Sequence, residues 1–234
     1  MLRLLAIETA TEACSVALYQ DGDVLERFEI APRRHAALVL PWVEALLTDA
    51  AITPAQLDAI AFGRGPGSFT GLRIAAGVTQ GLAFAADIPV VPVSTLAALA
   101  YGAHIASGRT NILAALDARM KEVYWGAYRV DSSGHASLVS EERVCAPEAV
   151  PLPGSGEWFG AGSGWQSYRD VLSARCDLSK TACLPDCLPH ASDIAQLAAG
   201  LYQVGEAVPP EQAAPVYLRN NVADKPKSNN LGSE

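Results

Sequence analysis

The stretch between residues 58 and 83 holds the most distinctive set of residues that could do chemistry. A short apolar run, 58–62, ends in Gly63, and a glycine-dense loop and an apolar helical pattern follow it. A strand, a glycine loop and a helix N-terminus in this order can seat an anion such as phosphate. We therefore expect nucleotide or phosphate contacts at Gly65, Gly67, Ser68, Thr70 and Gly71.

The same loop also fits a tight strand-to-helix turn that binds nothing, because glycine permits backbone angles and close approaches that a Cβ would block. It lacks the Lys-Ser/Thr pair that closes a phosphate-binding P-loop, and its glycine spacing differs from a dinucleotide-binding fingerprint. Ser68 or Thr70 would cap the helix under either interpretation. Both interpretations stay open on the sequence alone.

Two acids stand at the ends of apolar strand-like runs, Glu8 and Asp117. Acids in such places can orient a metal-bound nucleotide or a water molecule, and Thr9 and Thr11 add hydroxyl groups beside Glu8. The alternative, favoured for Asp117, is that the carboxylates accept hydrogen bonds from turn amides. The chain has no Gly-x-Ser-x-Gly elbow and no histidine spaced with a second ligand at helical i,i+4. We expect neither a catalytic residue nor a metal site.

The cysteines allow one further hypothesis. Cys183, Cys187 and His190, with Cys176 nearby, could supply three zinc ligands. The segment is rich in proline and leucine and has no second ligand pair, so ordinary reduced cysteines are favoured. The five cysteines are an odd number without disulfide-framework spacing. A reducing cytoplasm is the expected location.

Composition sets the broad class. The chain has 234 residues, half of them apolar, so it can bury a proper core. Its net charge of −8 is unlike that of proteins that grip a phosphate backbone unaided. A nucleic-acid role would therefore work through a partner. The sequence shows neither an apolar run of membrane-spanning length nor a secretory signal.

The pattern of apolar residues predicts two related halves. In the first half we expect strands at 2–8, 14–20, 24–30, 58–63 and 88–93, with helices at 34–50, 71–86 and 95–106. The pattern then restarts, since 4–8 resembles 113–117 and 15–19 resembles 124–128 at the same offset. In the second half we expect a third strand at 135–143, a strand at 158–161 and helices at 165–174 and 190–201. The predicted domains are 1–106 and 107–223, followed by a disordered tail at 224–234.

Two helices are more apolar than one buried face requires. The helix at 34–50 has few polar side chains, and the helix at 71–86 places Gly77, Gly81 and Ala85 four residues apart. Glycine inside a helix costs about 1 kcal/mol against alanine, so it needs a packing reason. We predict a subunit interface, with both helices serving as core of a larger layer as the alternative. The expected interface residues are His35, Leu38, Val39, Trp42, Val43, Leu46, Leu47, Leu72, Ile74, Gly77, Val78 and Gly81.

Five segments together resemble a known family. They read LAIETAT at 5–11, RHAALVLP at 34–41, GPGSFTGLR at 65–73, DARMKEVY at 117–124 and PVYLR at 215–219. They are similar to TsaB proteins, also called YeaZ, along nearly the whole chain up to the tail. The resemblance implies an α/β fold of two duplicated actin-like (ribonuclease H-like) domains, with mixed sheets flanked by helices.

The resemblance also implies a function. Members of the family that the chain resembles are non-catalytic partners in making N6-threonylcarbamoyladenosine at position 37 of tRNAs that read codons starting with A. They pair with TsaD, which transfers the threonylcarbamoyl group, and TsaE joins them. They also form homodimers through the N-terminal helices. The chain is then expected to meet tRNA only within the complex and to bind no cofactor alone, with ATP or ADP at the partner interface.

The chain departs from its relatives at a few positions. TsaD-like sisters carry two metal-binding histidines where Thr95 and Leu99 stand here, which argues against transferase and metallopeptidase chemistry. Glu8 replaces the usual Asp, a glycine of nucleotide-binding relatives is absent from 8–11, and Ala36 replaces a serine. An activating scaffold is the leading hypothesis, with a weak ATPase or kinase of the same fold as the alternative.

Overall fold

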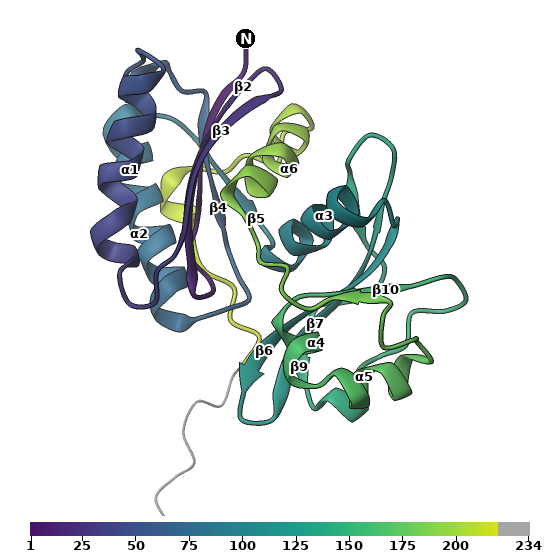
Figure 1. Cartoon of the computed structure of the whole chain (residues 1–234). Helices are drawn as coiled ribbons and strands as arrows, with labels where there is room; N and C mark the ends of the chain where they lie inside the picture. The colour runs from purple at the N-terminus through teal and green to yellow at the C-terminus, as the bar shows by residue number, and fades with distance from the viewer. Residues whose placement is uncertain (220–234) are drawn as a thin grey trace, which may run out of the picture.

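A computed structural model describes residues 1–219, which form two α/β lobes (Figure 1). The predicted tail at 224–234 lies outside the described residues. The first lobe contains a five-stranded sheet of order β3-β2-β1-β4-β5. Its first three strands form an antiparallel meander, and β4 and β5 continue it in parallel to β1. The strands are β1 Arg3–Glu8, β2 Ala13–Gln20, β3 Asp23–Ile30, β4 Ala59–Gly63 and β5 Val90–Val93.

Two long helices cover the outer face of this sheet, α1 (His35–Asp49) and α2 (Phe69–Ala86). Side chains alternate along β1, so Leu5 and Ile7 join the core beneath these helices while Leu4 and Ala6 join the core on the other face. A strand buried on both faces reads as a continuous apolar run. This explains why the apolar stretch at 2–8 predicts a central strand.

The second lobe repeats the connectivity of the first. Its sheet has the order β11-β10-β6-β7-β8, with β9 also pairing with β7. Again a meander comes first, and two parallel strands lie on the other side of its first strand. The repeat predicted from the sequence is therefore present in the topology. The strands are β6 Asn111–Arg119, β7 Glu122–Val130, β8 Ala136–Leu138, β9 Arg143–Cys145, β10 Phe159–Ala161 and β11 Cys183–Leu184.

Each lobe receives a helix from the other half of the chain. Helix α3 (Thr95–Ser107) follows β5 but packs mainly on β6 and β7, and α6 (Ala191–Gln203) follows β11 but packs on β1 and β2. Both lie between the two sheets (Figure 1). The division at residue 106 stays a prediction, and the packing crosses it in both directions.

The layer between the sheets is rich in alanine. Ala6 and Ala61 of the first sheet meet Ala195 and Ala198 of α6 in one buried cluster. Small side chains let a helix approach a sheet closely, and dense packing without voids is what stabilises such a layer. The two lobes therefore share one continuous core.

Three predicted elements differ from the structure. The strand expected at 135–143 is divided into β8 and β9, because Glu142 turns inward between them. The helix expected at 165–174 is divided into α4 (Ser163–Ser167) and α5 (Arg169–Cys176) at Tyr168, whose φ of −131° is not helical. The two-residue strand β11 carries too short a signal to be predicted.

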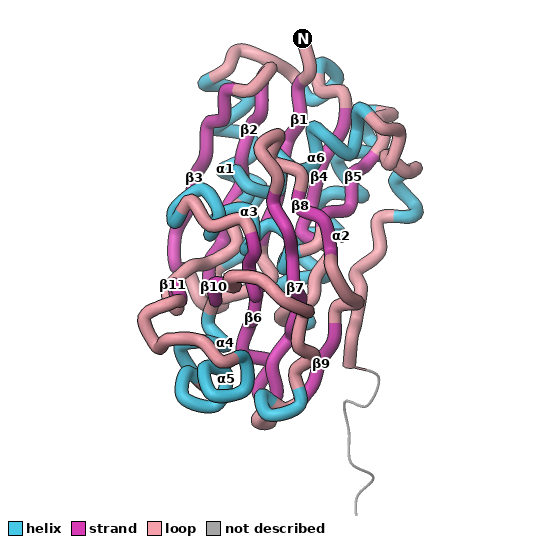
Figure 2. Tube along the Cα trace, turned by 90° about the vertical axis from the view of Figure 1, so that its right-hand side faces the viewer, coloured by secondary structure: helices cyan, strands magenta, loops and turns pink. Residues whose placement is uncertain are grey.

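The last described segment returns to the first lobe. Val208 pairs with Val90, and the short helix η3 (Pro210–Gln212) packs on α2. The amide of Val216 then donates to the carbonyl of Arg64 at 2.7 Å. In Figure 2 this segment runs down beside both sets of strands. No helix within residues 1–219 combines the length and apolar character needed to cross a membrane.

Candidate functional site

The glycine loop packs against the turn between β1 and β2. A Cβ at Gly67 would lie 2.6 Å from the carbonyl oxygen of Ala10, and a Cβ at Gly71 only 1.9 Å from that of Thr9. The amide of Ser68 donates to the Ala10 carbonyl at 2.7 Å. The Ser68 hydroxyl caps α2 by accepting from the Gly71 amide at 3.4 Å. Gly67 and Gly71 therefore serve close backbone packing, as the ligand-free interpretation of the loop requires.

The acid that ends β1 is enclosed by the first lobe. Glu8 is 1% exposed, and its two oxygens accept from the amide of Ala10 at 2.6 Å and from the hydroxyl of Thr95 at 3.0 Å. Burial raises the pKa of Glu8 to about 7. Thr9 is also buried and donates to the carbonyl of Gly71 at 2.8 Å. The polar atoms of Glu8 and Thr9 thus bond within the chain, and the expected nucleotide contact at these two residues stays a prediction.

A cleft of about 510 Å³ lies between the lobes, with the glycine loop on one side and the β6–β7 hairpin on the other. Its lining includes three of the predicted nucleotide contacts, Thr11, Gly67 and Ser68. The other loop candidates do not line it, since Gly65 and Gly71 are buried and Thr70 is exposed elsewhere. The cleft is thus real, but fewer of the predicted residues reach it than expected.

Asp117 lies on the second lobe's side of the cleft. Its Oδ1 accepts from the amide of Arg119 at 2.8 Å and its Oδ2 from the hydroxyl of Ser167 at 3.1 Å. Its own amide donates to Ser163 at 3.1 Å. The carboxylate therefore satisfies a turn amide, as the favoured alternative has it, while its side chain keeps 19% exposure toward the cleft.

Sequence reasoning missed several residues of the cleft. Ser163 comes from α4, and Tyr217 and Arg219 come from the last described segment, far from the glycine loop in sequence. The segment 215–219 belongs to the motifs that carry the family resemblance, but nothing local in it indicates a position beside the loop. Only the return of the chain to the first lobe brings these residues together.

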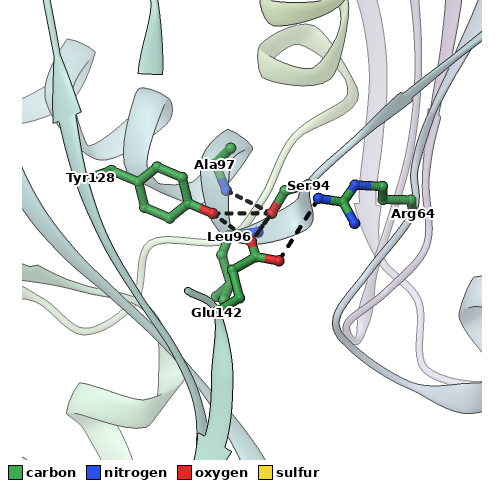
Figure 3. Close-up of polar contacts among 6 residues, drawn as sticks. All are labelled: Arg64, Ser94, Leu96, Ala97, Tyr128 and Glu142. Carbon is green, nitrogen blue, oxygen red and sulfur yellow. Dashed lines mark hydrogen bonds and ion pairs between the residues drawn. The ribbon is translucent and has the colours of Figure 1, made fainter. Parts of the chain in front are cut away.

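A buried polar cluster ties the lobes together behind this cleft (Figure 3). The hydroxyls of Ser94 and Tyr128 both donate to Glu142, whose second oxygen lies 3.9 Å from the guanidinium of Arg64. Ser94 also caps α3 by accepting from two of its first amides. Arg64 and Ser94 follow strands of the first sheet, and Tyr128 lies on β7. The cluster therefore fixes the second lobe against the first.

The predicted helical interface is half interior. His35, Val39, Val43, Leu46, Leu47 and Leu72 are each less than 9% exposed. Most of them join the core beneath α1 and α2. His35 and Leu72 instead line the cleft. These buried side chains leave little area for a second chain, and the interface stays a prediction. The remaining residues do reach the surface, partly or fully: Leu38, Trp42, Ile74, Gly77, Val78 and Gly81. We call these six residues the helical face.

The glycines of the helical face have no packing role within the chain. A Cβ at Gly77 or Gly81 would meet nothing within 4 Å. Each glycine in a helix interior costs about 1 kcal/mol against alanine. This contrasts with Gly71 of the same helix, where a Cβ would strike backbone. The described structure thus gives Gly77 and Gly81 no packing partner that requires a glycine.

The cysteine-rich segment does not gather zinc ligands. His190 places its Nδ1 3.0 Å from Glu26 and stacks on Phe28 with ring centroids 4.2 Å apart, which ties the start of α6 to β3. Its hydrogen bond to Glu26 raises the pKa of His190. All five cysteines are free thiols. Within residues 1–219, no three His, Cys, Asp or Glu side chains are placed to hold a metal ion.

The fold and cleft define a class: a two-lobed α/β protein of the actin-like, ribonuclease H-like kind. A family model described as "TsaD: tRNA N6-adenosine threonylcarbamoyltransferase" matches residues 28–227. Two solved structures from Pseudomonas aeruginosa, one described as YeaZ and one as similar to peptidase YeaZ, superpose with a TM-score of 0.87 at 49% identity. They cover 93% and 94% of this chain, and the match spans 100% of each of theirs.

Curated relatives agree with this classification. A protein of Escherichia coli described as "tRNA threonylcarbamoyladenosine biosynthesis protein TsaB" is 46% identical, over 96% of this chain and 97% of its own length. A protein of the same description from Haemophilus influenzae is 39% identical over 96% of both chains. The chain belongs to the TsaB (YeaZ) family.

Proposed function

We propose that this chain is an accessory subunit in the synthesis of threonylcarbamoyladenosine in tRNA, without catalysis of its own. The relatives in Escherichia coli and Haemophilus influenzae, described as threonylcarbamoyladenosine biosynthesis proteins, support the pathway. The helical face supports the mode of action, since half-buried apolar residues and exposed glycines on two adjacent helices suit docking of another helical surface. The single observation that carries the proposal is the open space around Gly77 and Gly81.

The partner that we propose is a TsaD-like transferase, joined by a TsaE-like ATPase, on tRNAs that read codons starting with A. The positions aligned with the sister's metal-binding histidines hold Thr95 and Leu99, both 0% exposed. Thr95 donates to Glu8, and Leu99 belongs to the central core. These two side chains offer no ligands, which supports placing the transfer chemistry in the partner. Alone, the chain would pair with a second copy through the same face, in the cytoplasm.

Nucleotide binding is proposed only at the partner interface, as ATP or ADP. In a nucleotide-binding relative, the acid at the position of Glu8 would face the bound nucleotide. Glu8 does not fit that role, because both its oxygens accept hydrogen bonds inside the first lobe. A weak ATPase activity of the chain alone would need an acid in the cleft. Asp117 is the candidate, and its two oxygens already accept from Arg119 and Ser167.

The test is reconstitution with a TsaD-like and a TsaE-like subunit, scored by modified adenosine in tRNA. Gly77→Glu should abolish both co-purification with the TsaD-like subunit and modification. Gly200→Glu is the matched control, since Gly200 is also an exposed helical glycine with open space around it. Equal loss in both variants, or modification by this chain alone, would contradict the proposal. Leu46 is unsuitable for this test because it is 3% exposed.

A further inference from the structure

The mouth of the cleft carries a flat, exposed group made of Phe69, Arg73 and Tyr217, which we call the aromatic platform. Phe69 is 52% and Tyr217 42% exposed, and both line the cleft. The Arg73 guanidinium lies 3.9 Å from the centre of the Phe69 ring, and the two rings lie 5.3 Å apart. Arg73 Nε also donates to the Tyr217 hydroxyl at 3.3 Å. The three flat groups therefore hold one another in place without being buried.

Two separate segments build this platform. Phe69 is the first residue of α2, directly after the Ser68 cap, and Arg73 follows one turn later on the same side of the helix. Tyr217 arrives with the returning C-terminal segment, whose Val216 is bonded to the loop. An exposed ring that is fixed in this way loses little freedom when a ligand stacks on it.

Basic residues in unusual backbone conformations stand at the same mouth. Arg33 and Arg119 line the cleft with φ values of 68° and 61°. Met120 and Lys121, which complete the β6–β7 turn, are also left-handed, at 54° and 61°. Non-glycine residues in this region carry a cost of about 1 kcal/mol or more each, and such strain concentrates where it serves binding. The Arg119 side chain is 87% exposed, although it lies 3.7 Å from Asp117.

Aromatic rings beside arginines are the means by which proteins hold unpaired nucleotides, with bases stacked on the rings and phosphates on the guanidinium groups. The cleft is lined by the acids Glu12 and Asp117 and by three arginines, Arg33, Arg119 and Arg219. The net charge of −8 restricts contact with a nucleic acid to a short stretch.

We propose that the aromatic platform stacks an unpaired base of an RNA loop, with the adjoining phosphates on Arg33 and Arg119. Such a direct contact by the chain itself departs from the expectation, drawn from its net charge, that RNA is met only through a partner. The choice of RNA over a free nucleotide rests on the proposed function. Phe69 and Arg73 lie at four-residue spacing with Gly77 and Gly81 along α2, so the platform continues one edge of the helical face. The variants Phe69→Ala and Gly77→Glu are therefore scored in both the RNA titration and the co-purification assay.

The test is a fluorescence anisotropy titration of the full chain with a labelled RNA stem-loop whose loop bases are unpaired, and with a blunt RNA duplex of equal length. The stem-loop should bind, and Phe69→Ala should weaken binding roughly tenfold, the loss of one stacked base. Phe69→Tyr should restore it. Arg119→Ala should lower the slope of log affinity against log salt by about 1. Phe84→Ala is the matched control, an 80% exposed phenylalanine of the same helix outside the cleft.

Several results would overturn the assignment. Equal binding by the Phe69→Ala and Phe84→Ala variants, or equal binding of duplex and stem-loop, would remove the stacking role. If binding of ATP depends on Phe69 and binding of RNA does not, the ligand of the platform is a free nucleotide. If the Phe69→Ala variant no longer binds a TsaD-like subunit but binds RNA as before, the platform is a contact for protein. Gly77→Glu should keep RNA binding, so failure of the docking proposal is seen separately.

Discussion

The two lobes have the same strand order and different outer layers. Between its meander and its parallel strands, the first lobe carries α1 of 15 residues, and between the parallel strands it carries α2 of 18. At the corresponding places the second lobe has the single turn η2 (Pro147–Ala149) and the short helices α4 and α5, of 5 and 8 residues. The repeat is kept where both lobes share a core and has diverged where each faces outward.

The outer layers also differ in how they are closed. The second lobe completes its own core with large side chains, since Trp165 is fully buried, donates to the Leu113 carbonyl at 2.9 Å and packs on Trp125. The first lobe leaves Gly77, Gly81 and a half-buried Trp42 at its surface. The second lobe therefore fills its outer layer with large buried side chains, whereas the first lobe has the surface that we propose for docking.

The strand-end acids show the same divergence. Glu8 and Asp117 each accept from the amide two residues later, at 2.6 and 2.8 Å. Glu8 is enclosed, and a Cβ at Gly63 would lie 2.0 Å from its carboxylate. Asp117 faces the cleft instead. A shared local turn thus produces a buried acid in one lobe and an accessible one in the other.

The largest expected effect concerns the glycine in the first turn of the helix that follows the first parallel strand of each lobe, β4 and β10. Gly71→Ala would place a Cβ 1.9 Å from the Thr9 carbonyl, and Gly164→Ala 2.7 Å from the Ala115 side chain. We expect losses of about 3 kcal/mol or more for the first and about 1–3 kcal/mol for the second. Denaturant unfolding measures both. A smaller loss at Gly71 than at Gly164 would break the comparison.

The buried acid of the first lobe should make stability depend on pH. Its pKa is raised from 4.5 to about 7 in the fold, so between these values the folded chain keeps a proton that the unfolded chain has released. The free energy of unfolding should therefore fall as pH rises through this window, by at most roughly 3 kcal/mol from Glu8.

Glu8→Gln should flatten this dependence, since its oxygen can accept from the Ala10 amide while its NH2 donates to the Thr95 hydroxyl in place of accepting from it. Asp193, half-buried at the start of α6, has its pKa also raised to about 7 by desolvation and contributes in the same direction, so Asp193→Asn should flatten it further. The measurement is urea unfolding at a series of pH values. An unchanged pH profile in the Glu8→Gln variant would mean that the buried carboxyl does not titrate in this window.

The cluster that joins the lobes gives a smaller effect. Glu142→Gln removes the charge that Ser94, Tyr128 and Arg64 face, and the Glu142 side chain is 7% exposed. We expect a loss of about 2 kcal/mol, since hydrogen bonds to a buried charged group are strong. Glu141→Gln is the control, because the neighbouring Glu141 is 68% exposed; its cost should stay below about 0.5 kcal/mol. Equal effects would show that the cluster does not hold the lobes.

The smallest effect should be a gain. Gly77→Ala fills open space on α2, so the free energy of unfolding of the monomer should rise by about 1 kcal/mol. Gly200→Ala on α6 should give a similar gain. Unfolding at a protein concentration where the chain is monomeric tests both. A loss at Gly77 would show that this glycine has a role within the chain after all.

The sequence by itself determined the central strands, the long helices and the repeat. Leu4–Glu8 and Leu113–Asp117 are apolar runs that end in an acid, because both faces of their sheets are covered. Such a run can be recognised from the sequence alone. Glycine spacing likewise located the loop before α2. These features depend on local periodicity, which is why they could be predicted without coordinates.

Only the tertiary structure decided which side chains remain available for function. It exchanged α3 and α6 between the lobes, buried Glu8 and half of the predicted interface, and brought Tyr217 to Phe69. Each outcome depends on contacts between segments far apart in the chain. A helix's periodicity shows that it has an apolar face, but the element that covers that face is chosen by the packing of the whole molecule.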